Sequence, residues 1–262
     1  MASRLGEICK ELRLADLEKL ALQVDYRDPH QYLTDVLELA LKQRQTRRIE
    51  RLIRQAGFPS TKTLEGFDFA PVSFPNSIDK EGLLSLGFMD RRENLCFVGS
   101  CGTGKTYLAT ALGLKACGLG KSVMFYRCVD LANELLEKYP KGQAGKLINQ
   151  IAKCDLLILD EVGFIPFSNR AAEMLFTVIS NSYERQSVII TSNLNFGDWN
   201  RIFGDDRLTA ALIDRLIHHS HILAFEGPSY RFKQALANRG TNTKEVLGTS
   251  STSTHEEQTY DR

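Results

Sequence analysis

The residues with the most recognisable chemistry lie in one glycine-rich stretch, GSCGTGKT, at positions 99–106. Its spacing matches the phosphate-binding pattern G-x-x-x-x-G-K-[ST]. In such a loop the glycines let backbone N–H groups turn toward phosphate oxygens, and the N-terminus of the following helix adds its positive end. The stretch therefore predicts a nucleoside triphosphate site whose contacts come from Gly99, Ser100, Cys101, Gly102, Thr103, Gly104, Lys105, Thr106 and Tyr107.

Two of these residues and two later carboxylates predict the catalytic chemistry. Lys105 is expected to reach the β- and γ-phosphates, and Thr106 to place its hydroxyl on Mg²⁺. In the stretch CDLLILDEVGF, the apolar residues 156–159 predict a buried strand that delivers Asp160 and Glu161 to its C-terminal edge. We expect Asp160 to hold Mg²⁺, directly or through water, and Glu161 to act as general base toward the attacking water.

The acidic pair narrows the class of nucleotide-dependent protein. GTPases typically place a glycine after the metal-binding aspartate and need an N-K-x-D motif, which does not occur in this sequence. Small-molecule kinases with this loop usually lack the adjacent glutamate. The pair therefore favours ATP hydrolysis used for mechanical or switching work, with Mg²⁺ as the cofactor.

Two further kinds of polar side chain are expected near the γ-phosphate. Asn193 follows the strand-like run SVIITS, and its amide is suited to orienting the attacking water and sensing the γ-phosphate. Arg207 and Arg215 lie about two turns apart on a predicted helix, so both can fall on one face. An arginine presented to a neighbouring subunit's γ-phosphate stabilises charge in the transition state. We predict this role for Arg215 ahead of Arg207; ordinary ion pairs with nearby aspartates are the alternative.

The elements that must position these residues alternate between strand-like and helix-like runs from about residue 80 onward. This alternation predicts an α/β fold with a five-stranded parallel sheet covered by helices on both faces. The predicted strands are 94–98, 122–126, 155–159, 187–191 and 221–225, and the predicted helices are 106–116, 129–138, 144–152, 170–183 and 208–219. We divide the chain into a helical N-terminal domain (1–60), a connector (61–80), an ATPase domain (81–238) and a disordered Ser/Thr-rich tail (239–262).

The N-terminal part reads as helical, with a helix start at Pro29 and Asp28 as its cap. The same helix then carries a basic run with a single acid, Glu50. Such a concentrated field suits DNA phosphates without base readout, whereas a solvated face with ion pairs is the alternative. The candidate DNA contacts are Lys42, Arg44, Arg47, Arg48, Arg51 and Arg54, with Lys141 and Lys146 as a second candidate surface facing an oligomer pore.

Composition excludes several other classes. The 262 residues are 43% hydrophobic and 25% charged with a net charge of +1, which is typical of a globular protein and excludes a chain that is basic throughout. The apolar runs are too short to span a bilayer, and the N-terminus lacks the apolar core of a secretory signal. The six cysteines form no C-x-x-C pair or zinc pattern, so we expect reduced thiols in a cytoplasmic protein.

Four stretches in this order resemble the IstB family of transposition ATPases, which are AAA+ proteins close to the DnaC and DnaI helicase loaders. They are GSCGTGKTYLATALG, LLILDEVGFIPF, SVIITSNLNFGDW and LTAALIDRLIHHSHILAFEGPSYR, and the resemblance extends from about Leu5 to Lys233. One departure is the triplet 101–103, where relatives often have Pro-Gly-Val. The short remainder after Phe225 leaves no room for the helical lid of many AAA+ proteins, which also fits this branch.

The resemblance implies an ATPase that oligomerises on duplex DNA with ATP, with its sites at subunit interfaces. It further implies that hydrolysis selects target sites and stimulates an IstA-like transposase. By matching positions, Lys105 and Thr106 take the Walker A roles, Asp160 and Glu161 the Walker B roles, Asn193 that of sensor 1, and Arg215 that of the finger. Arg231, in the segment SYR, is a weaker candidate for an arginine that faces the nucleotide.

Two other functions stay open at the level of sequence. A DnaC/DnaI-like helicase loader would use its N-terminal helices to grip a hexameric helicase. A metabolic kinase or ATPase unrelated to DNA would turn over ATP at a rate insensitive to duplex DNA.

Overall fold

The structure is a computed structural model that describes residues 4–11, 13–14, 16–26 and 28–230. Its centre is a sheet with strand order β1-β6-β2-β5-β4-β3. The strands β2 to β6 are mutually parallel, whereas β1 pairs antiparallel with β6. Their bounds are β1 Val72–Ser73, β2 Asn94–Gly99, β3 Val123–Arg127, β4 Leu156–Val162, β5 Ser187–Ser192 and β6 Ser220–Phe225.

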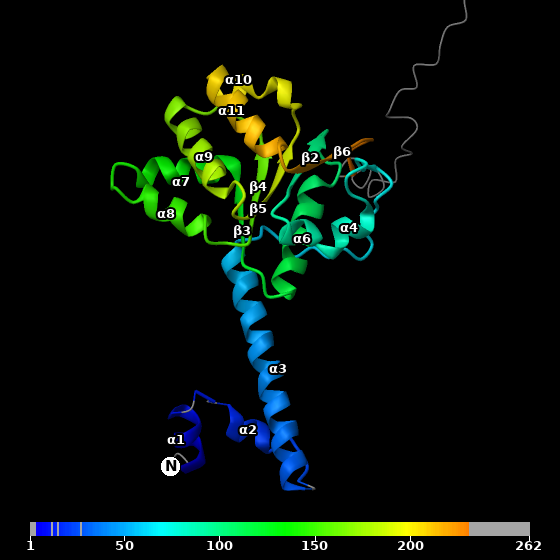
Figure 1. Cartoon of the computed structure of the whole chain (residues 1–262), viewed down its shortest axis with the longest axis vertical. Helices are drawn as coiled ribbons and strands as arrows, with labels where there is room; N and C mark the ends of the chain where they lie inside the picture. The colour runs from blue at the N-terminus through cyan, green and yellow to red at the C-terminus, as the bar shows by residue number, and fades with distance from the viewer. Residues whose placement is uncertain (1–3, 12, 15, 27, 231–262) are drawn as a thin grey trace, which may run out of the picture.

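The helices cover both faces of this sheet (Figure 1). Those in the sheet domain are α4 Lys80–Ser85, α5 Gly87–Asp90, α6 Lys105–Gly118, α7 Cys128–Lys138, α8 Ala144–Ile151, α9 Asn169–Ser182, the 3₁₀ turn η1 Phe196–Asp198, α10 Asn200–Phe203 and α11 Asp206–Ile217. The predicted α/β class is confirmed.

The prediction of a purely parallel five-stranded sheet was incomplete. The two-residue strand β1 adds an antiparallel edge, with Val72 opposite Phe225. It lies in the stretch that we predicted as a connector without periodic structure. Two residues are too few to show the alternation that marks a strand, so only the tertiary pairing with β6 defines it.

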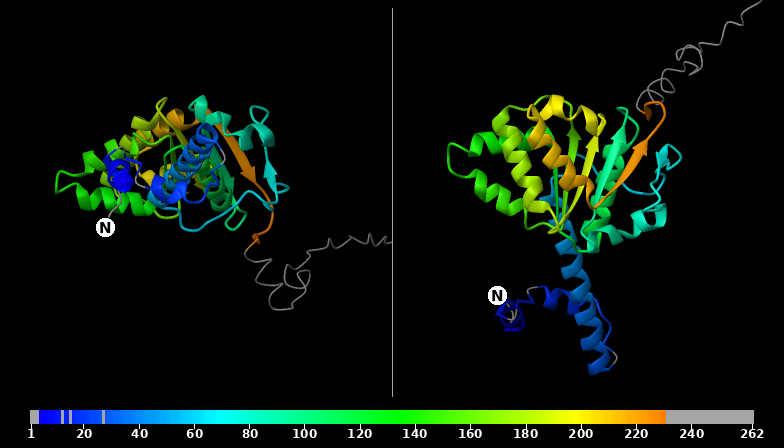
Figure 2. Two further views of the ribbon diagram at one scale, coloured as in Figure 1. Left: turned by 90° about the horizontal axis from the view of Figure 1, so that it is seen from below. Right: turned by 45° about the horizontal axis from the view of Figure 1, so that its top comes forward.

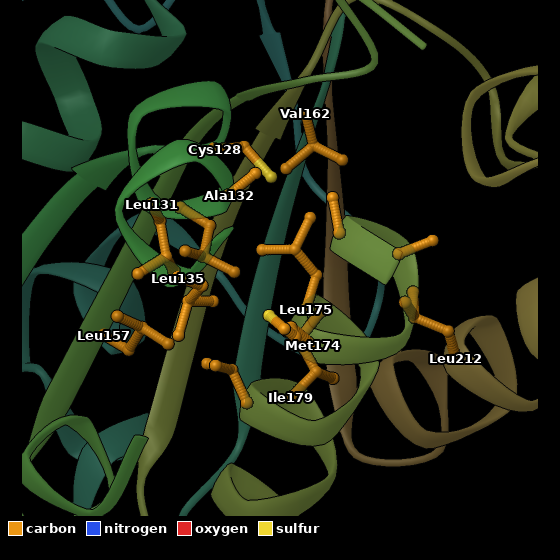
Figure 3. Packing of buried hydrophobic residues seen from close by; sticks show 14 of the residues in the cluster. Cys128, Leu131, Ala132, Leu135, Leu157, Val162, Met174, Leu175, Ile179 and Leu212 are labelled. Atoms are coloured by element: carbon orange, nitrogen blue, oxygen red, sulfur yellow. The ribbon is translucent and has the colours of Figure 1, made fainter. Parts of the chain in front are cut away.

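The central strand β4 shows why both faces of the sheet need helices. Leu157 and Leu159 belong to an apolar cluster with α7, α9 and α11, which Figure 3 shows from close by. Leu156 and Ile158, pointing the opposite way, belong to a second cluster with α6 and the end of α3. Successive side chains of a strand alternate between faces, so the uninterrupted apolar run of β4 is buried on both sides.

The N-terminal helices project away from the sheet domain. They are α1 Arg4–Glu11, α2 Leu17–Ala21 and α3 Pro29–Ala56. Figure 1 shows α3 as a long stalk with α1 and α2 near its distal end, and the views in Figure 2 agree. The predicted start of α3 is confirmed: Asp28 caps it by accepting a 2.8 Å hydrogen bond from the backbone N–H of Gln31, and Pro29 occupies the first turn.

Only the proximal end of α3 packs against the sheet domain. Leu52, Ile53 and Ala56 join the apolar cluster that contains α6. Farther out, Leu33, Leu37 and Leu41 remain 59%, 50% and 57% exposed. Within the described part of the chain, no helix is long and apolar enough to cross a membrane.

Candidate functional site

The glycine-rich loop connects β2 to α6, as its motif predicted. Lys105, the first residue of α6, donates hydrogen bonds of 2.6 Å from Nζ to the backbone oxygens of Gly99 and Ser100. Thr103 closes the loop internally by donating a 2.8 Å hydrogen bond to the same carbonyl of Ser100. The loop is therefore held in a compact turn at the N-terminus of α6, where backbone N–H groups and the helix dipole favour an anion.

A cavity of about 800 Å³ opens beside this loop. Residues 101–107 line one side of it, and Glu161 and Asn193 reach it from the ends of β4 and β5. Its volume lies within the range of sites that bind a nucleotide-sized ligand. The structure thus brings together the predicted loop, the predicted general base and the predicted sensor around one cavity.

Asp160 is the best-buried carboxylate in this site, with 2% of its surface exposed. Its Oδ1 accepts a 2.8 Å hydrogen bond from the hydroxyl of Thr106 and a 2.6 Å hydrogen bond from the hydroxyl of Thr191. Buried charge is tolerated only when it is hydrogen-bonded or paired with a cation. The two oxygens proposed as Mg²⁺ ligands, on Thr106 and Asp160, are therefore adjacent, and Mg²⁺ prefers such hard oxygen donors completed by water and phosphate.

Glu161 adopts an unusual backbone conformation with φ of 58°. The pairing of β4 with β5 is irregular between Leu159 and Val162, which marks a bulge around the acidic pair. Neighbouring side chains of a regular strand point to opposite faces, so this distortion lets Glu161 line the cavity while Asp160 faces Thr106. A left-handed conformation costs a non-glycine residue about 1 kcal/mol or more, and such strain is concentrated at functional sites.

Thr191 holds this bulge in place, a role that the sequence did not reveal. Its Oγ1 accepts a 2.9 Å hydrogen bond from the backbone N–H of Glu161 and donates to Asp160. One buried hydroxyl on β5 thus fixes both members of the acidic pair.

Arg127, at the end of β3, is a second residue that sequence reasoning missed. It lies opposite Asp160 in the strand register. Its pKa is raised mainly by its hydrogen bond to Asp130, and in smaller measure by the negative charges of Glu161 and Asp160. The guanidinium therefore belongs to the electrostatic environment of the acidic pair.

The side-chain oxygen of Asn193 is an unsatisfied acceptor within the described part of the chain. Its Oδ1 is buried and has no hydrogen-bond partner among the described residues. Buried acceptors are rarely left unpaired, because the loss of hydration costs about 1–3 kcal/mol. An unpaired oxygen at the cavity suits contact with a water or another donor there.

The two predicted finger arginines lie on α11, outside the residues that line this cavity. Arg215 is half-buried: it is hydrogen-bonded to the hydroxyl of Ser180 and stacks on Phe176 with the guanidinium carbon 4.7 Å from the ring centroid. Arg207 is exposed in the first turn. Arg231 and the predicted tail lie outside the described residues.

The segment between α3 and β1 forms the wall of the cavity that the motifs did not predict. Pro59, Lys62 and Phe67 line it together with Tyr107. The rings of Phe67 and Tyr107 lie 5.4 Å apart, and Lys62 Nζ lies 5.3 Å from the centroid of Tyr107. These residues precede the loop by 30 positions or more in a stretch without periodicity, so only the folded chain brings them to the site.

The geometry of α3 places only some residues of its basic run along a groove. A groove of about 490 Å³ lies between α2 and α3, with leucines of α2 and the preceding turn at its apolar side. The cations of α3 that line it are Arg44, Arg47, Arg48 and Arg51, which recur at intervals of three or four residues and so share one face. Lys42 and Arg54 are not among the residues that line it.

Several of the candidate DNA contacts already have protein partners. Arg47 forms an ion pair with Asp16, and Arg48 donates a 3.3 Å hydrogen bond to the backbone oxygen of Gly120. Lys141, in the second candidate surface, pairs with Glu137 at 2.8 Å, whereas Lys146 is exposed on α8.

Comparisons with known proteins agree on one family. A family model described as IstB-like ATP binding protein matches residues 14–238. An ATP-binding protein of insertion sequence IS5376 from Geobacillus stearothermophilus is 35% identical over 240 residues, covering 89% of this chain and 96% of the relative. A corresponding protein of insertion sequence IS21 from Pseudomonas aeruginosa is 37% identical over 228 residues, covering 86% of this chain and 79% of the relative.

Among solved structures, the replication initiator DnaA bound to AMPPCP and single-stranded DNA is similar with a TM-score of 0.53 and 26% identity. The match covers 73% of this chain and 59% of that one.

Proposed function

The chain belongs to the family of IstB-like ATP-binding proteins, and from that premise we propose that it is a Mg²⁺-dependent ATPase of an insertion sequence. The observation that carries the proposal is the hydrogen bond between Thr106 and Asp160, which joins the phosphate loop to the acidic pair. This contact supports the proposal because it brings the loop next to Asp160, whose neighbour Glu161 lines the same cavity as the loop.

The proposed reaction is hydrolysis of the γ-phosphate. Bound Mg²⁺ supplies positive charge that neutralises the phosphate oxygens, and Thr106 and Asp160 are the residues that would hold it. Glu161 takes a proton from the attacking water, whose oxygen bonds to the γ-phosphorus. The bond from that phosphorus to the bridging oxygen breaks, so ADP and phosphate leave. Lys105 stabilises the phosphate charge, and the unpaired oxygen of Asn193 orients the water.

We place the complete site between two subunits. Arg215 is the arginine that would reach the γ-phosphate of a neighbouring copy, with Arg207 as the second candidate. To do so, Arg215 must exchange its contacts with Ser180 and Phe176 for contacts across the interface. This exchange would make assembly depend on the nucleotide.

DNA is the proposed polymer on which the copies assemble. The groove-lining arginines of α3 form a cationic face on a helix that projects from the ATPase domain, which suits contact with duplex phosphates. The relatives are proteins of insertion sequences, so the proposed biological role is to select target DNA and to stimulate the partner transposase, an IstA-like protein.

The experiment that tests this proposal is an ATPase assay with and without duplex DNA. We expect Mg²⁺-dependent turnover that rises when duplex DNA is added, and assembly on the DNA when ATP is present. Turnover that is insensitive to DNA would favour a metabolic ATPase instead.

A second function is favoured by one feature of α3. Leu33, Leu37 and Leu41 recur at helical spacing and remain exposed, although apolar side chains contribute nothing to phosphate binding. A helicase loader that grips its helicase through the N-terminal helices would use such a row as an anchor. Capture of purified helicase rather than purified transposase, lost on Leu37→Glu, would support this alternative.

A further inference from the structure

The segment that follows β6 returns to the phosphate loop. The backbone N–H of Tyr230 donates a 2.8 Å hydrogen bond to the backbone oxygen of Gly102. Four residues earlier, the N–H of Glu226 donates a 2.8 Å hydrogen bond to Pro71 of the connector. Residues 226–230 are thus tied at one end to the connector and at the other to the loop.

The contact between this segment and the loop is close enough to require glycine. Gly102 has φ of 79°, and a Cβ at this position would lie 2.1 Å from Oγ of Ser229. Both the positive φ and the lack of space exclude a larger residue without displacement. The segment therefore lies in close contact with the loop.

This position brings Tyr230 to the cavity. It lines the same cavity as Lys105 and Glu161, yet 59% of its surface is exposed. A large aromatic side chain that is anchored through its backbone and left uncovered at a cavity is suited to packing against a ligand. The other rings on the cavity wall are those of Phe67, Tyr107 and Phe164.

The two ends of a nucleotide need different partners. The phosphates require the N–H groups of the loop and the cations and metal beside them, whereas a purine and its ribose gain from aromatic surfaces. Lys105, Thr106 and Asp160 supply the first kind of contact. Tyr230 has no charge, and its phenol offers a single O–H donor beside a large aromatic face, which suits the second kind of contact.

We propose that Tyr230 contacts the nucleoside of the bound nucleotide, with its ring against the purine or ribose. The inference rests on the proposed function in one respect, that this cavity binds ATP. Tyr230 then forms part of the wall on the nucleoside side, and its hydrogen bond to Gly102 couples that part of the wall to the phosphate loop.

A comparison of two ligands distinguishes a nucleoside contact of Tyr230 from a purely structural support of the loop by this residue. ATP and inorganic tripolyphosphate share the phosphate chain, but only ATP carries the base and ribose. The full-length protein is titrated with a fluorescent ATP analogue, and each ligand then competes for the site. Tyr230→Ala should weaken ATP binding about tenfold, the usual effect of losing one stacked ring, and leave tripolyphosphate unchanged. Tyr230→Phe should bind ATP as the wild type does.

A control variant and a folding check define the results that would contradict the proposal. Tyr139→Ala removes a tyrosine that is 51% exposed and stacked with Arg170, and it should change neither affinity. Thermal melting checks that each variant is folded. An equal loss for both ligands in Tyr230→Ala, or no loss for ATP, overturns the nucleoside contact. A wild-type protein that binds ATP no better than tripolyphosphate also overturns it, whereas failure of the wild type to hydrolyse bound ATP contradicts only the proposed ATPase.

Discussion

The hydroxyl of Thr106 and the carboxylate of Asp160 lie 2.8 Å apart, although 54 residues separate them in the chain. The hydrogen bond joins the first turn of α6 to the end of β4, across the sheet edge where parallel strands place their ligands. Because Asp160 is 2% exposed, its carboxylate relies on hydrogen bonds from Thr106 and Thr191 in place of water. The hydrogen bond therefore fixes the position of the phosphate loop relative to the acidic pair.

Loss of the Thr106 hydroxyl or of the Asp160 carboxylate charge should abolish the Mg²⁺ dependence of ATP binding. We expect Thr106→Ala and Asp160→Asn each to weaken binding in Mg²⁺ by about 10- to 100-fold, the usual cost of disturbing a metal site. Thr106→Ser keeps the hydroxyl and should retain the dependence. Calorimetric titration with ATP in Mg²⁺ and in EDTA measures the effect; a Thr106→Ala protein that still responds to Mg²⁺ would contradict the assignment.

Glu161→Gln should separate binding from hydrolysis. The amide cannot accept the proton of the attacking water, so turnover should fall by about 10² to 10⁴ while ATP remains bound. ATP-bound oligomers should then accumulate on DNA, which size-exclusion chromatography with duplex DNA detects. The matched control is Glu173→Gln, at an exposed glutamate that pairs with Arg170. Oligomers that fall apart in Glu161→Gln would show that the general-base assignment is wrong.

The sequence predicted the parts of this site whose signals are local. The strands β2 and β4, and the loop and acidic pair that follow them, are each defined by consecutive residues. The bulge at Glu161 could not be predicted in the same way, because it depends on a hydrogen bond from Glu161 to Thr191 on the adjacent strand.

The residues of the cavity wall were even harder to predict from local sequence patterns. Phe67 and Tyr230 meet the phosphate loop from opposite directions in the chain, through long-range contacts with no periodic pattern. Likewise, the sequence predicted six candidate DNA contacts along the basic run, whereas the helix places four of them along one groove. Periodicity identifies the face of a helix, but the packing of α2 decides which part of that face forms a groove.

Charge reversal along α3 should distinguish its two faces. Arg44 and Arg51 are better targets than Arg47 and Arg48, which hold Asp16 and Gly120. The double variant Arg44→Glu/Arg51→Glu should weaken duplex DNA binding. It should also lower the slope of log K against log salt by about 1 for each DNA phosphate that the protein no longer neutralises.

Lys42→Glu serves as the comparison, since Lys42 lies on the same helix but outside the groove. It should cause a smaller loss, and ATP binding should persist in both proteins. Filter binding over a range of salt measures both quantities. Equal losses from Lys42→Glu and from the double variant would show that the groove does not define the DNA contact.

The carboxylate of Glu93 links pH to the contact between a buried histidine and the connector. His221 contacts Ser77 Oγ at 2.7 Å through Nδ1 and Glu93 Oε2 at 3.0 Å through Nε2. The hydrogen bond from Arg91, followed by that from His221, lowers the pKa of Glu93 below its ordinary value of 4.5. A lowered carboxyl pKa contributes to the free energy of unfolding above the unfolded-state pKa, and this contribution is lost as pH falls through the folded-state pKa.

Glu93→Gln should therefore flatten the acid side of the stability profile. Melting temperatures of the wild type should fall more steeply than those of the variant between about pH 5 and pH 3. Near pH 7 the variant should be the less stable protein, because the carboxylate contacts are absent. Parallel profiles for the two proteins would mean that other carboxyl groups control the acid transition.

Cys101 should be the thiol that reacts first with an alkylating reagent. It is exposed and lines the cavity beside the phosphate loop, whereas the other five cysteines are buried. Burial raises the pKa of Cys96 and Cys128 to about 12 and that of Cys117 to about 11, so these thiols hold almost no reactive thiolate near neutral pH. Iodoacetamide should thus modify Cys101 selectively and block ATP binding, because the added group occupies the cavity beside the loop.

Bound ATP should slow the modification, and Cys101→Ser should bind ATP and resist inactivation. Peptide mass spectrometry locates the label; first modification at a buried cysteine, or full ATP binding by the labelled protein, would refute the placement of Cys101 at the nucleotide.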